Sequence, residues 1–370
     1  MRAVSELDAG FMRRALALAR RGLGRVEPNP MVGCVLVRGG KIIGEGYHRR
    51  FGGAHAEVEA LRRCDSGAKG ATAYVTLEPC CFHGKTPACS DALIAAGVRR
   101  VAAAVRDPHR RVSGRGASLL REAGVKVDFG VLADEANELA GPYIKWVTQQ
   151  RPWVILKWAQ SLDGRIATRS GDSKWISDET ARGHAHRTRG RVDAILVGVG
   201  TVISDDPMLT CRVGRAKRIA TRIVLDTKLR MPPRAKLVTT ARETPTWIFC
   251  GRDAAISRAV ALKKRGCVIH RVRAGRGGVS PKSVLDVLGR AAMTNLLVEG
   301  GGRTLGAFHD AGLADEYHVY IASLLIGGRE ATGALDARGP ARVEECPRLG
   351  SNRTLRRLGS GWFVQFRADR

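Results

Sequence analysis

One histidine, one glutamate and two cysteines stand in two short blocks that are suited to metal chemistry. The first block is H-A-E at 55–57, and the second is E-P-C-C-F-H-G-K-T-P-A-C at 78–89. A catalytic zinc ion takes three nitrogen or sulfur ligands and keeps one open position for water. His55, Cys80 and Cys89 can supply these ligands. Zinc brings the pKa of bound water towards neutrality, so hydroxide becomes available at pH 7. Glu57 lies two residues after His55 and can carry the proton without being a ligand.

The second block also contains two rival ligands. Cys81 is adjacent to Cys80, and His83 takes the place of the second cysteine of a C-x-x-C motif. We favour Cys89, because it is expected near the start of a helix at 86–96, where it can converge with a loop thiolate. Single cysteines are often core residues, so the argument rests on the whole set. The order H-x-E, P-C and C is typical of zinc-dependent nucleobase deaminases.

The size and charge of the chain restrict the classes of protein and partner. A chain of 370 residues with 44% hydrophobic residues predicts two domains. The net charge is +27, of which residues 1–150 carry +8 and residues 151–370 carry +19. The basic residues are dispersed and aromatic residues make up 5%, which leaves few stacking platforms for bases. We therefore expect no nucleic-acid partner, and a phosphorylated small substrate instead.

The sequence also predicts where the protein works. No apolar run approaches the roughly 20 residues of a membrane span, so we expect no membrane partner. Residues 11–22 predict an amphipathic helix that Arg residues interrupt, unlike a signal peptide. The cysteines outside the metal block are scattered, which favours reduced thiols. We expect a cytoplasmic protein.

Residues 1–150 predict a three-layered α/β domain. Helices are expected at 9–22, 55–64, 86–96, 116–123 and 133–147, and strands at 32–37, 41–47, 72–77, 99–105 and 125–129. Metal ligands then lie at the starts of two helices, where backbone N–H groups favour thiolate and hydroxide. The domain boundary is expected at 149–152, because Pro152 and the polar residues before it end the preceding helix.

Residues 151–370 predict a second α/β domain with a mostly parallel sheet. Strands are expected at 152–158, 194–198, 222–226, 247–250 and 295–300, and helices at 178–189, 254–265, 282–291 and 302–311. Glycine-rich turns at 197–201 and 298–306 follow two of these strands, and such turns let a pyrophosphate approach backbone N–H groups. Neither turn matches G-x-G-x-x-G, so a purely structural turn explains each equally well. The polar segments 161–177 and 204–212 are further candidates for a cleft that holds a sugar phosphate and a nicotinamide.

The two halves together resemble the bifunctional riboflavin-biosynthesis deaminase–reductases. The matching segments are E-P-N-P-M-V-G-C at 27–34, H-A-E-V at 55–58, T-L-E-P-C at 76–80, G-K-T-P-A-C at 84–89, S-L-D-G-R-I-A at 161–167, S-D-D-P-M-L-T at 204–210 and V-E-G-G at 298–301. The resemblance implies a cytidine-deaminase-like zinc domain over 1–150 and a dihydrofolate-reductase-like, NADPH-dependent domain over 151–370. It implies deamination of 2,5-diamino-6-(5-phosphoribosylamino)pyrimidin-4(3H)-one. NADPH then reduces the ribosyl group of 5-amino-6-(5-phosphoribosylamino)uracil to ribityl.

The resemblance also implies roles for individual residues and a homo-oligomer formed through the reductase domain. In the deaminase it implies zinc ligation by His55, Cys80 and Cys89 and proton transfer by Glu57. It implies substrate contacts by Asn29, His48 and Lys85. In the reductase it implies cofactor contacts by Ala159, Trp175, Thr201, Asp205, Gly300, Gly301, Gly302, Arg303, Thr304 and Leu305. It implies reductase substrate contacts by Ser173, Arg189, Leu209, Arg212 and Glu299. Two of these, Arg189 and Arg212, are natural phosphate holders, because a planar guanidinium binds oxygens in pairs.

The chain departs from the family pattern near the predicted zinc site. Many relatives have a small polar residue and then His after Cys80, whereas this chain has Cys81 and Phe82 followed by His83. A substrate-holding role of that His either moves to His83 or is lost. His109 stands where relatives often have Asn. No residue is assigned as the proton donor of the reductase, and no single basic residue separates NADPH from NADH.

Two alternative functions remain. A nucleic-acid base deaminase would explain the charge and the zinc site, but it would not need S-L-D-G-R or V-E-G-G, and its affinity for RNA would depend steeply on salt. The other alternative is a deaminase whose C-terminal half is structural and oxidises no NADPH. Lys85, Asp205 and Glu299 argue against both.

Overall fold

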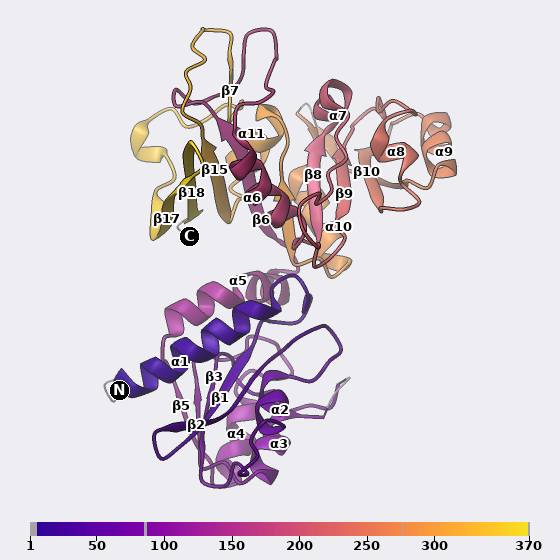
Figure 1. The fold of residues 1–370 in the computed structure, drawn as a ribbon. Coiled ribbons are helices and arrows are strands. Elements are labelled where there is room, and N and C mark those ends of the chain that lie inside the picture. The colour runs from indigo at the N-terminus through magenta and orange to yellow at the C-terminus, as the bar shows by residue number, and fades with distance from the viewer. Residues whose placement is uncertain (1–5, 85–86, 276, 369–370) are drawn as a thin grey trace. The chain divides into compact units, whose positions relative to one another are not determined.

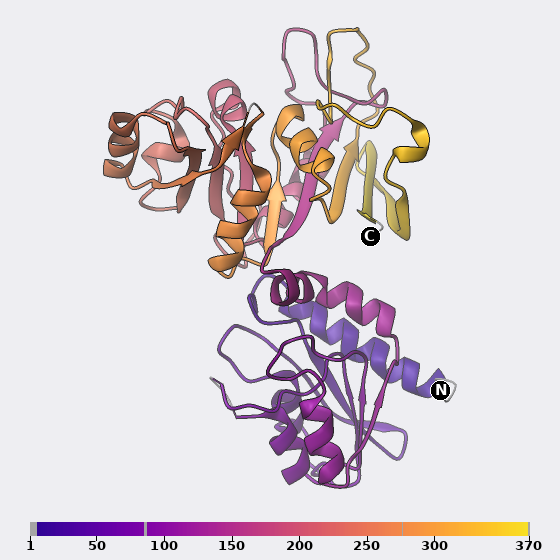
Figure 2. The same cartoon turned by 180° about the vertical axis from the view of Figure 1, so that it is seen from behind.

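The chain forms two compact units, Met1–Gln150 and Arg151–Arg370. The structure is a computed structural model, and it describes residues 6–84, 87–275 and 277–368. Each unit is built on one large sheet with helices on both of its faces, as Figures 1 and 2 show from opposite sides. Lys85 lies outside the described residues, so its contact with substrate stays a prediction.

The N-terminal unit contains a five-stranded sheet in the order β2-β1-β3-β4-β5. Its strands are β1 (Gly33–Arg38), β2 (Lys41–Tyr47), β3 (Thr72–Val75), β4 (Arg100–Ala103) and β5 (Lys126–Phe129). Its helices are α1 (Glu6–Ala19), α2 (Ala56–Leu61), α3 (Cys89–Ala95), α4 (Arg115–Glu122) and α5 (Ala133–Gln149). β1 is antiparallel to β2 and β3, whereas β3, β4 and β5 are parallel. Every helix and strand expected in this half is present, with its ends shifted by a few residues.

The alternation of side chains along β1 explains the three layers. Successive residues of a strand point to opposite faces of the sheet. Cys34 and Leu36 pack in a core with residues of α2, α3 and α4. Val35 and Val37 pack in a second core with residues of α1 and α5. Figure 1 shows α1 and α5 along one face of the sheet and the other three helices on the opposite face.

The C-terminal unit contains a nine-stranded sheet in the order β11-β10-β9-β8-β14-β6-β15-β18-β17. Its strands are β6 (Trp153–Gln160), β8 (Ala194–Gly198), β9 (Thr221–Leu225), β10 (Thr246–Gly251), β11 (Val268–Val272), β14 (Asn295–Val298), β15 (Glu316–Ile321), β17 (Leu349–Leu358) and β18 (Gly361–Ala368). The short strands β7 (Arg165–Ala167), β12 (Ala274–Gly275), β13 (Gly278–Val279) and β16 (Thr332–Gly333) form two further pairs. Its α-helices are α6 (Glu179–Arg189), α7 (Val199–Asp205), α8 (Lys236–Thr239), α9 (Ile256–Lys264), α10 (Pro281–Arg290) and α11 (Gly302–Asp310).

The five strands expected in this half are present in the parallel part of the sheet, whereas the parallel strands β11 and β15 and the antiparallel strands β17 and β18 were missed. All neighbouring strands from β11 to β15 are parallel, and only β15-β18 and β18-β17 are antiparallel. β17 contains charged residues such as Arg356 and Arg357, so it lacks the continuous apolar run by which buried parallel strands are found. The turn expected at 197–201 also differs, because α7 begins within it at Val199.

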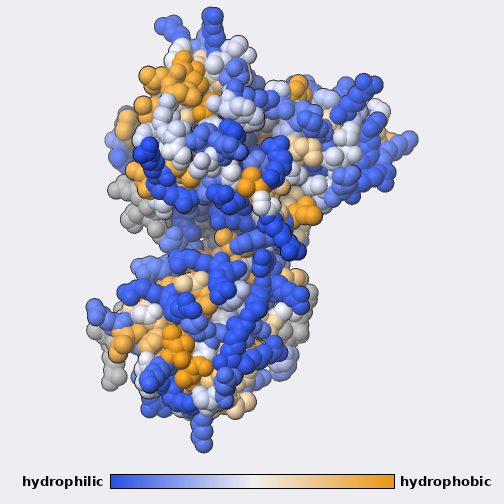
Figure 3. Space-filling view, in the orientation of Figure 1, coloured by the Kyte–Doolittle hydropathy of each residue, from blue (hydrophilic) through white to orange (hydrophobic). Residues whose placement is uncertain are grey.

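The surface is polar over most of the face that Figure 3 shows, and hydrophobic residues lie there in small separate patches. Within the part of the chain that the structure describes, no helix is long and apolar enough to cross a membrane. All nine cysteines are free thiols.

Candidate active sites

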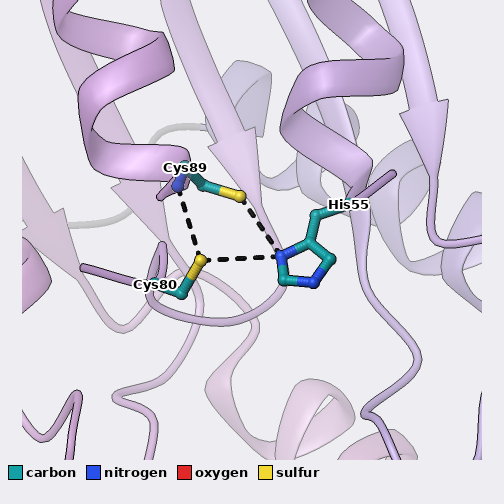
Figure 4. A group of neighbouring side chains, drawn as sticks. All are labelled: His55, Cys80 and Cys89. Atoms are coloured by element: carbon teal, nitrogen blue, oxygen red, sulfur yellow. Dashed lines mark hydrogen bonds between the residues drawn. The ribbon is translucent and has the colours of Figure 1, made fainter. Parts of the chain in front are cut away.

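Three predicted metal ligands converge in the N-terminal unit. His55 is the residue before α2, Cys80 follows β3, and Cys89 is the first residue of α3. The His55 Nδ1 atom lies 3.5 Å from the Cys80 sulfur and 3.4 Å from the Cys89 sulfur, and the three ligand atoms all lie within 4.8 Å of one another. Figure 4 shows both sulfur atoms facing the same side of the imidazole. One nitrogen and two sulfur donors at this spacing fit zinc with one position left open.

The protonation of this cluster follows from burial and from its internal hydrogen bonds. The hydrogen bond with Cys89 lowers the pKa of the Cys80 thiol, and His55 lowers it further. The backbone N–H of Cys89 also donates to the Cys80 sulfur at 3.4 Å. Glu57 is buried in the first turn of α2, and burial together with the nearby Cys80 raises its pKa to about 7. Cys81 points elsewhere, since its thiol contacts the carbonyl oxygen of Arg111 at 3.3 Å.

A cavity of about 340 Å³ opens onto this cluster and contains two of the predicted substrate residues. His55, Glu57, Asn29 and His48 all line it. His48 Nδ1 lies 3.0 Å from the carbonyl oxygen of Ala54, so it must carry the proton and donate. His48 Nε2 then accepts from Asn29 Nδ2 at 3.2 Å. The Asn29 side-chain oxygen is left for a substrate in the cavity.

Phe82 and His109, at the two positions where the chain departs from the pattern expected of its relatives, form part of the wall of the cavity. Phe82 and His109 both line the cavity, and their rings stack with centroids 6.0 Å apart. The Arg111 guanidinium lies 3.9 Å from the centroid of the Phe82 ring. His83 does not line the cavity, and its side chain is 74% exposed beside Asp91. The geometry therefore gives no support for a transfer of the histidine's role to His83.

Glu78 organises the loop that carries His109, a role that the sequence did not reveal. Its side chain is buried and accepts hydrogen bonds from the backbone N–H groups of Asp107, Gly114 and Ala117, at 3.3, 3.0 and 3.1 Å. Buried N–H groups need such partners, so the carboxylate holds the loop against the cavity.

The C-terminal unit has a second cavity, of about 710 Å³, which gathers most of the predicted reductase residues. Those that line it are Ala159, Ser173, Trp175, Arg189, Thr201, Asp205, Arg212, Glu299, Gly300 and Gly301. Those that do not are Leu209, Gly302, Arg303, Thr304 and Leu305. Leu209 and Leu305 lie in hydrophobic cores, and Arg303 faces solvent beside Asp336. The roles of all these residues stay predictions.

The two glycine-rich turns lie side by side at the edge of this cavity. β8 and β14 are neighbouring parallel strands, so their carboxyl ends meet, which is where open α/β sheets bind ligands. The Gly301 N–H donates to Thr201 Oγ1 at 3.2 Å, which joins the turns. A Cβ atom at Gly198 would lie 2.6 Å from Thr304 Oγ1, and one at Gly300 would lie 2.5 Å from Thr304 Cβ. Glycine is therefore required here for packing, and the backbone next to α11 stays accessible to a phosphate.

Arg189 and Glu299 form a forked ion pair at the floor of this cavity. The Arg189 Nε and Nη2 atoms donate to the two Glu299 oxygens at 2.9 and 2.5 Å. Burial raises the pKa of Glu299, but Arg189 and Lys157 outweigh it and lower the pKa to about 2. Arg189 is therefore committed to a carboxylate, and Arg212 is the better placed of the two predicted phosphate holders.

Several residues that line the cavity were not singled out in the sequence, and three of them bear on the chemistry. Lys157, His186 and Tyr320 all line the cavity, and Lys157 Nζ lies 5.3 Å from the centroid of the Tyr320 ring. Lys157 could have been predicted as a functional residue, because it interrupts the apolar run V-I-L-K-W and lysine is rarely found inside a buried strand without a partner or a function. His186 and Tyr320 carried no such signal, since single polar residues on a helix or strand are common.

The polar segment at 161–177 divides between two tasks. Trp175 lies at the cavity, is 67% exposed and has the Arg182 guanidinium 4.6 Å from its ring centroid. Asp163 instead accepts hydrogen bonds from the backbone N–H groups of Ile326 and Gly327, at 3.0 and 2.8 Å. The S-L-D-G-R motif therefore joins two loops, and none of its residues lines the cavity.

Comparisons with known proteins cover both units. Residues 5–105 match the cytidine and deoxycytidylate deaminase zinc-binding region, and residues 152–358 match the RibD C-terminal domain. The riboflavin biosynthesis protein RibD of Aquifex aeolicus is 41% identical over 364 residues, which cover 98% of this chain and 99% of that protein. The corresponding protein of Escherichia coli is 41% identical over 354 residues, 92% of this chain and 94% of that protein.

Solved structures agree with these matches over the full length. A diaminohydroxyphosphoribosylaminopyrimidine deaminase/5-amino-6-(5-phosphoribosylamino)uracil reductase from Thermotoga maritima is 34% identical, with a TM-score of 0.85 over 98% of this chain and 99% of that one. Acinetobacter baumannii RibD is 33% identical, with a TM-score of 0.86 over 99% of both chains. This chain belongs to the RibD family of bifunctional riboflavin-biosynthesis enzymes, which join a deaminase to a pyrimidine reductase.

Proposed function

We propose that this chain deaminates 2,5-diamino-6-(5-phosphoribosylamino)pyrimidin-4(3H)-one and then reduces the ribosyl group of the resulting uracil with NADPH. The observation that carries the first step is the convergence of His55, Cys80 and Cys89 within 4.8 Å, next to a cavity that His55, Cys80 and Glu57 line. The second step is supported by the C-terminal cavity, in which a glycine-rich helix start and a buried ion pair lie together.

In the deaminase, His55, Cys80 and Cys89 would hold zinc, which supplies a Lewis acid that makes water acidic near neutral pH. Glu57 takes the proton from the attacking water and delivers it to the departing amino nitrogen. Its burial in the same cavity keeps the carboxyl close to the reacting carbon and away from bulk water. Asn29, held by His48, offers its side-chain oxygen to the N–H groups of the pyrimidine.

In the reductase, NADPH supplies the hydride, and the accessible backbone at Gly300 and Gly301 suits its phosphates. Arg212 lies at the cavity and binds the phosphate of the substrate. Lys157 is the group that we assign as proton donor to the ribosyl oxygen. It lines the cavity beside Glu299, and burial lowers the pKa of its ammonium, which makes it a better acid.

We also propose that two copies of the chain associate through a surface of the C-terminal unit. β17 is the last strand in the order of the nine-stranded sheet, and Leu355 and Trp362 on β17 and β18 are 68% and 41% exposed. Edge strands with exposed apolar residues favour pairing with another chain. A cytoplasmic location is proposed as well, in keeping with nine cysteines that are all free thiols.

A coupled assay on purified, zinc-loaded protein tests the function. Ammonia release and NADPH oxidation are followed together with the diaminopyrimidinone as substrate, for wild type and Glu57→Gln. We expect both signals in wild type. We expect Glu57→Gln to lose ammonia release by roughly 10²–10⁴-fold, but to oxidise NADPH when 5-amino-6-(5-phosphoribosylamino)uracil is supplied directly.

A matched control comes from the same helix. Glu59 lies two residues after Glu57, but it forms surface ion pairs with Arg49 and Arg63. Glu59→Gln is expected to keep both activities. Ammonia without NADPH oxidation in wild type would favour the deaminase with a non-catalytic partner domain. Neither signal, together with salt-dependent RNA binding, would favour the nucleic-acid deaminase.

A further inference from the structure

His186 lies on α6 at the C-terminal cavity and contacts the residue proposed to bind the substrate phosphate. Its Nδ1 atom lies 3.0 Å from the carbonyl oxygen of Thr210, and its Nε2 atom lies 3.3 Å from Arg212 Nη2. The backbone N–H of Arg212 also approaches Nδ1 at 3.3 Å. The imidazole therefore contacts Arg212 through both of its nitrogen atoms.

These contacts determine which nitrogen of His186 carries the proton. A carbonyl oxygen can only accept, so the 3.0 Å contact with Thr210 requires Nδ1–H, and the longer 3.3 Å approach of the Arg212 backbone N–H to Nδ1 is then not a hydrogen bond. The lone pair is then on Nε2, where it accepts from the Arg212 guanidinium. In the other tautomer, Nδ1 would accept only the longer contact from the Arg212 backbone N–H. The proton on Nε2 would then point at an N–H group of the Arg212 guanidinium, which repels it. The neutral ring with its proton on Nδ1 is the form that fits.

Arg212 depends on this contact for its direction. Its side chain is exposed, and among the described residues its guanidinium makes no ion pair with a carboxylate. Arg189, by contrast, has two of its N–H groups bound to Glu299. A long, exposed guanidinium samples many rotamers unless something holds it, and ordering it costs free energy when a ligand binds.

We propose that His186 is a positioning residue of the reductase, whose neutral imidazole aims the Arg212 guanidinium at the phosphate of the substrate. The inference rests on the proposed function, because it takes Arg212 as the phosphate contact. It adds a residue that acts through Arg212 and does not itself touch the reacting atoms. It also makes phosphate binding depend on the protonation state of one histidine.

The charges around His186 favour its neutral form. Arg189 on the same helix, Arg212 from the segment after α7 and Glu299 at the end of β14 face it. Burial lowers the pKa of His186 and the two guanidiniums lower it further, while the hydrogen bond to the Thr210 carbonyl and the charge of Glu299 raise it but do not outweigh them. The ring therefore stays neutral at pH 7 and gains its proton only below its ordinary value of 6.5. Protonation removes the Nε2 lone pair and places a positive charge beside Arg212.

Two substitutions separate the hydrogen bonds from the bulk of the side chain. Gln at 186 can donate to Thr210 and accept from Arg212, whereas Leu fills similar space and can do neither. We measure KM and kcat for 5-amino-6-(5-phosphoribosylamino)uracil with the full chain and NADPH, and the Kd for ribose 5-phosphate by calorimetry. His186→Leu should raise KM and Kd by about tenfold, the cost of one charged hydrogen bond, with kcat within about twofold of wild type. His186→Gln should recover most of the loss.

The pH profile provides a readout that a structural role would not change. The substrate phosphate itself gains a proton near pH 6, so KM rises for every variant as the pH falls. The ratio of wild-type KM to His186→Gln KM should nevertheless increase as the pH falls below 6.5 and the imidazole, followed by NMR, gains its proton, because only wild type acquires a positive charge at 186. This comparison decides the matter even if His186→Leu does not fold.

A double variant tests whether His186 acts through Arg212. In the Arg212→Gln background, His186→Leu should raise KM no further, because the guanidinium that it aims is absent. Additive effects, a loss in kcat alone, or equal damage by His186→Gln and His186→Leu would overturn the proposal. If Arg212→Gln alone leaves KM unchanged while wild type still oxidises NADPH, the phosphate contact is wrong but the proposed reductase activity stands.

Discussion

Replacing Glu299 by Gln is expected to destabilise the C-terminal unit by about 3 kcal/mol, because it leaves the partly buried cations of Arg189 and Lys157 without their counter-charge. The Glu299 carboxylate accepts two N–H groups of Arg189, and its side chain is 5% exposed. Arg189 and Lys157 overcome the effect of burial and lower the pKa of Glu299 from 4.5 to about 2. Lowering the pKa of this carboxyl from 4.5 to about 2 corresponds to roughly 3 kcal/mol of stability at neutral pH.

The assay is urea unfolding at pH 7, followed by tryptophan fluorescence. Five of the six tryptophans, all except Trp146, lie in residues 151–370, so the signal reports mainly the C-terminal unit. The matched control is Asp286→Asn, which breaks the pair with Arg151 at a position where the aspartate side chain is 40% exposed. An exposed pair contributes about 1 kcal/mol or less, so the control should change the unfolding free energy little.

The difference between wild type and Glu299→Gln should also depend on pH. A carboxyl with a lowered pKa in the folded state stabilises fully above its unfolded value of about 4.5, and this contribution disappears as the pH falls towards 2. The two curves should therefore converge between pH 4.5 and pH 2. A loss at pH 7 no larger than that of Asp286→Asn, or a difference that does not change across this window, would refute the reasoning.

Two further substitutions test how the scaffold of the deaminase supports its site. Gly46→Ala would place a Cβ atom 2.3 Å from the Ala56 carbonyl oxygen at the start of α2. We therefore expect the free energy of unfolding to fall by about 1–3 kcal/mol and the bound zinc to decrease, as measured by urea unfolding and metal analysis. Gly10→Ala in α1, where a Cβ meets nothing within 4 Å, is the control, and full zinc content in Gly46→Ala would contradict the argument. Glu78→Ala leaves three backbone N–H groups without their acceptor, so we expect a loss of about 3 kcal/mol and slower ammonia release, and unchanged stability would exclude this role.

The sequence was most informative where function depends on a few residue types at short spacing. Zinc accepts few donor combinations, so His55, Cys80 and Cys89 could be singled out before any fold was known. The helices and strands of the N-terminal unit could also be predicted from the sequence, because hydrophobic periodicity is a local property of the chain. The structure agrees with the choice of Cys89 over the two rival ligands, because Cys81 contacts a backbone carbonyl and His83 faces solvent.

The residues of the C-terminal cavity were harder to predict from the sequence, because its contacts join residues that are far apart in the chain. Arg189 was read as a phosphate holder, yet it is bound to Glu299, 110 residues away. The two glycine-rich turns gave weak signals separately and meet only because β8 and β14 are neighbours in the sheet. The antiparallel strands at the C-terminus were missed, since their mixed polar pattern fits an exposed loop as well as an edge strand.

The sequence by itself therefore determined the metal chemistry, the α/β class and the two-part organisation, which all follow from residue type and local periodicity. Only the tertiary structure decided which charges neutralise one another, which arginine stays available to a phosphate, and that His186 lies against it. These properties depend on distances between side chains from different strands and helices. Such distances cannot be predicted from local sequence patterns, because strand order and long-range packing determine the distances.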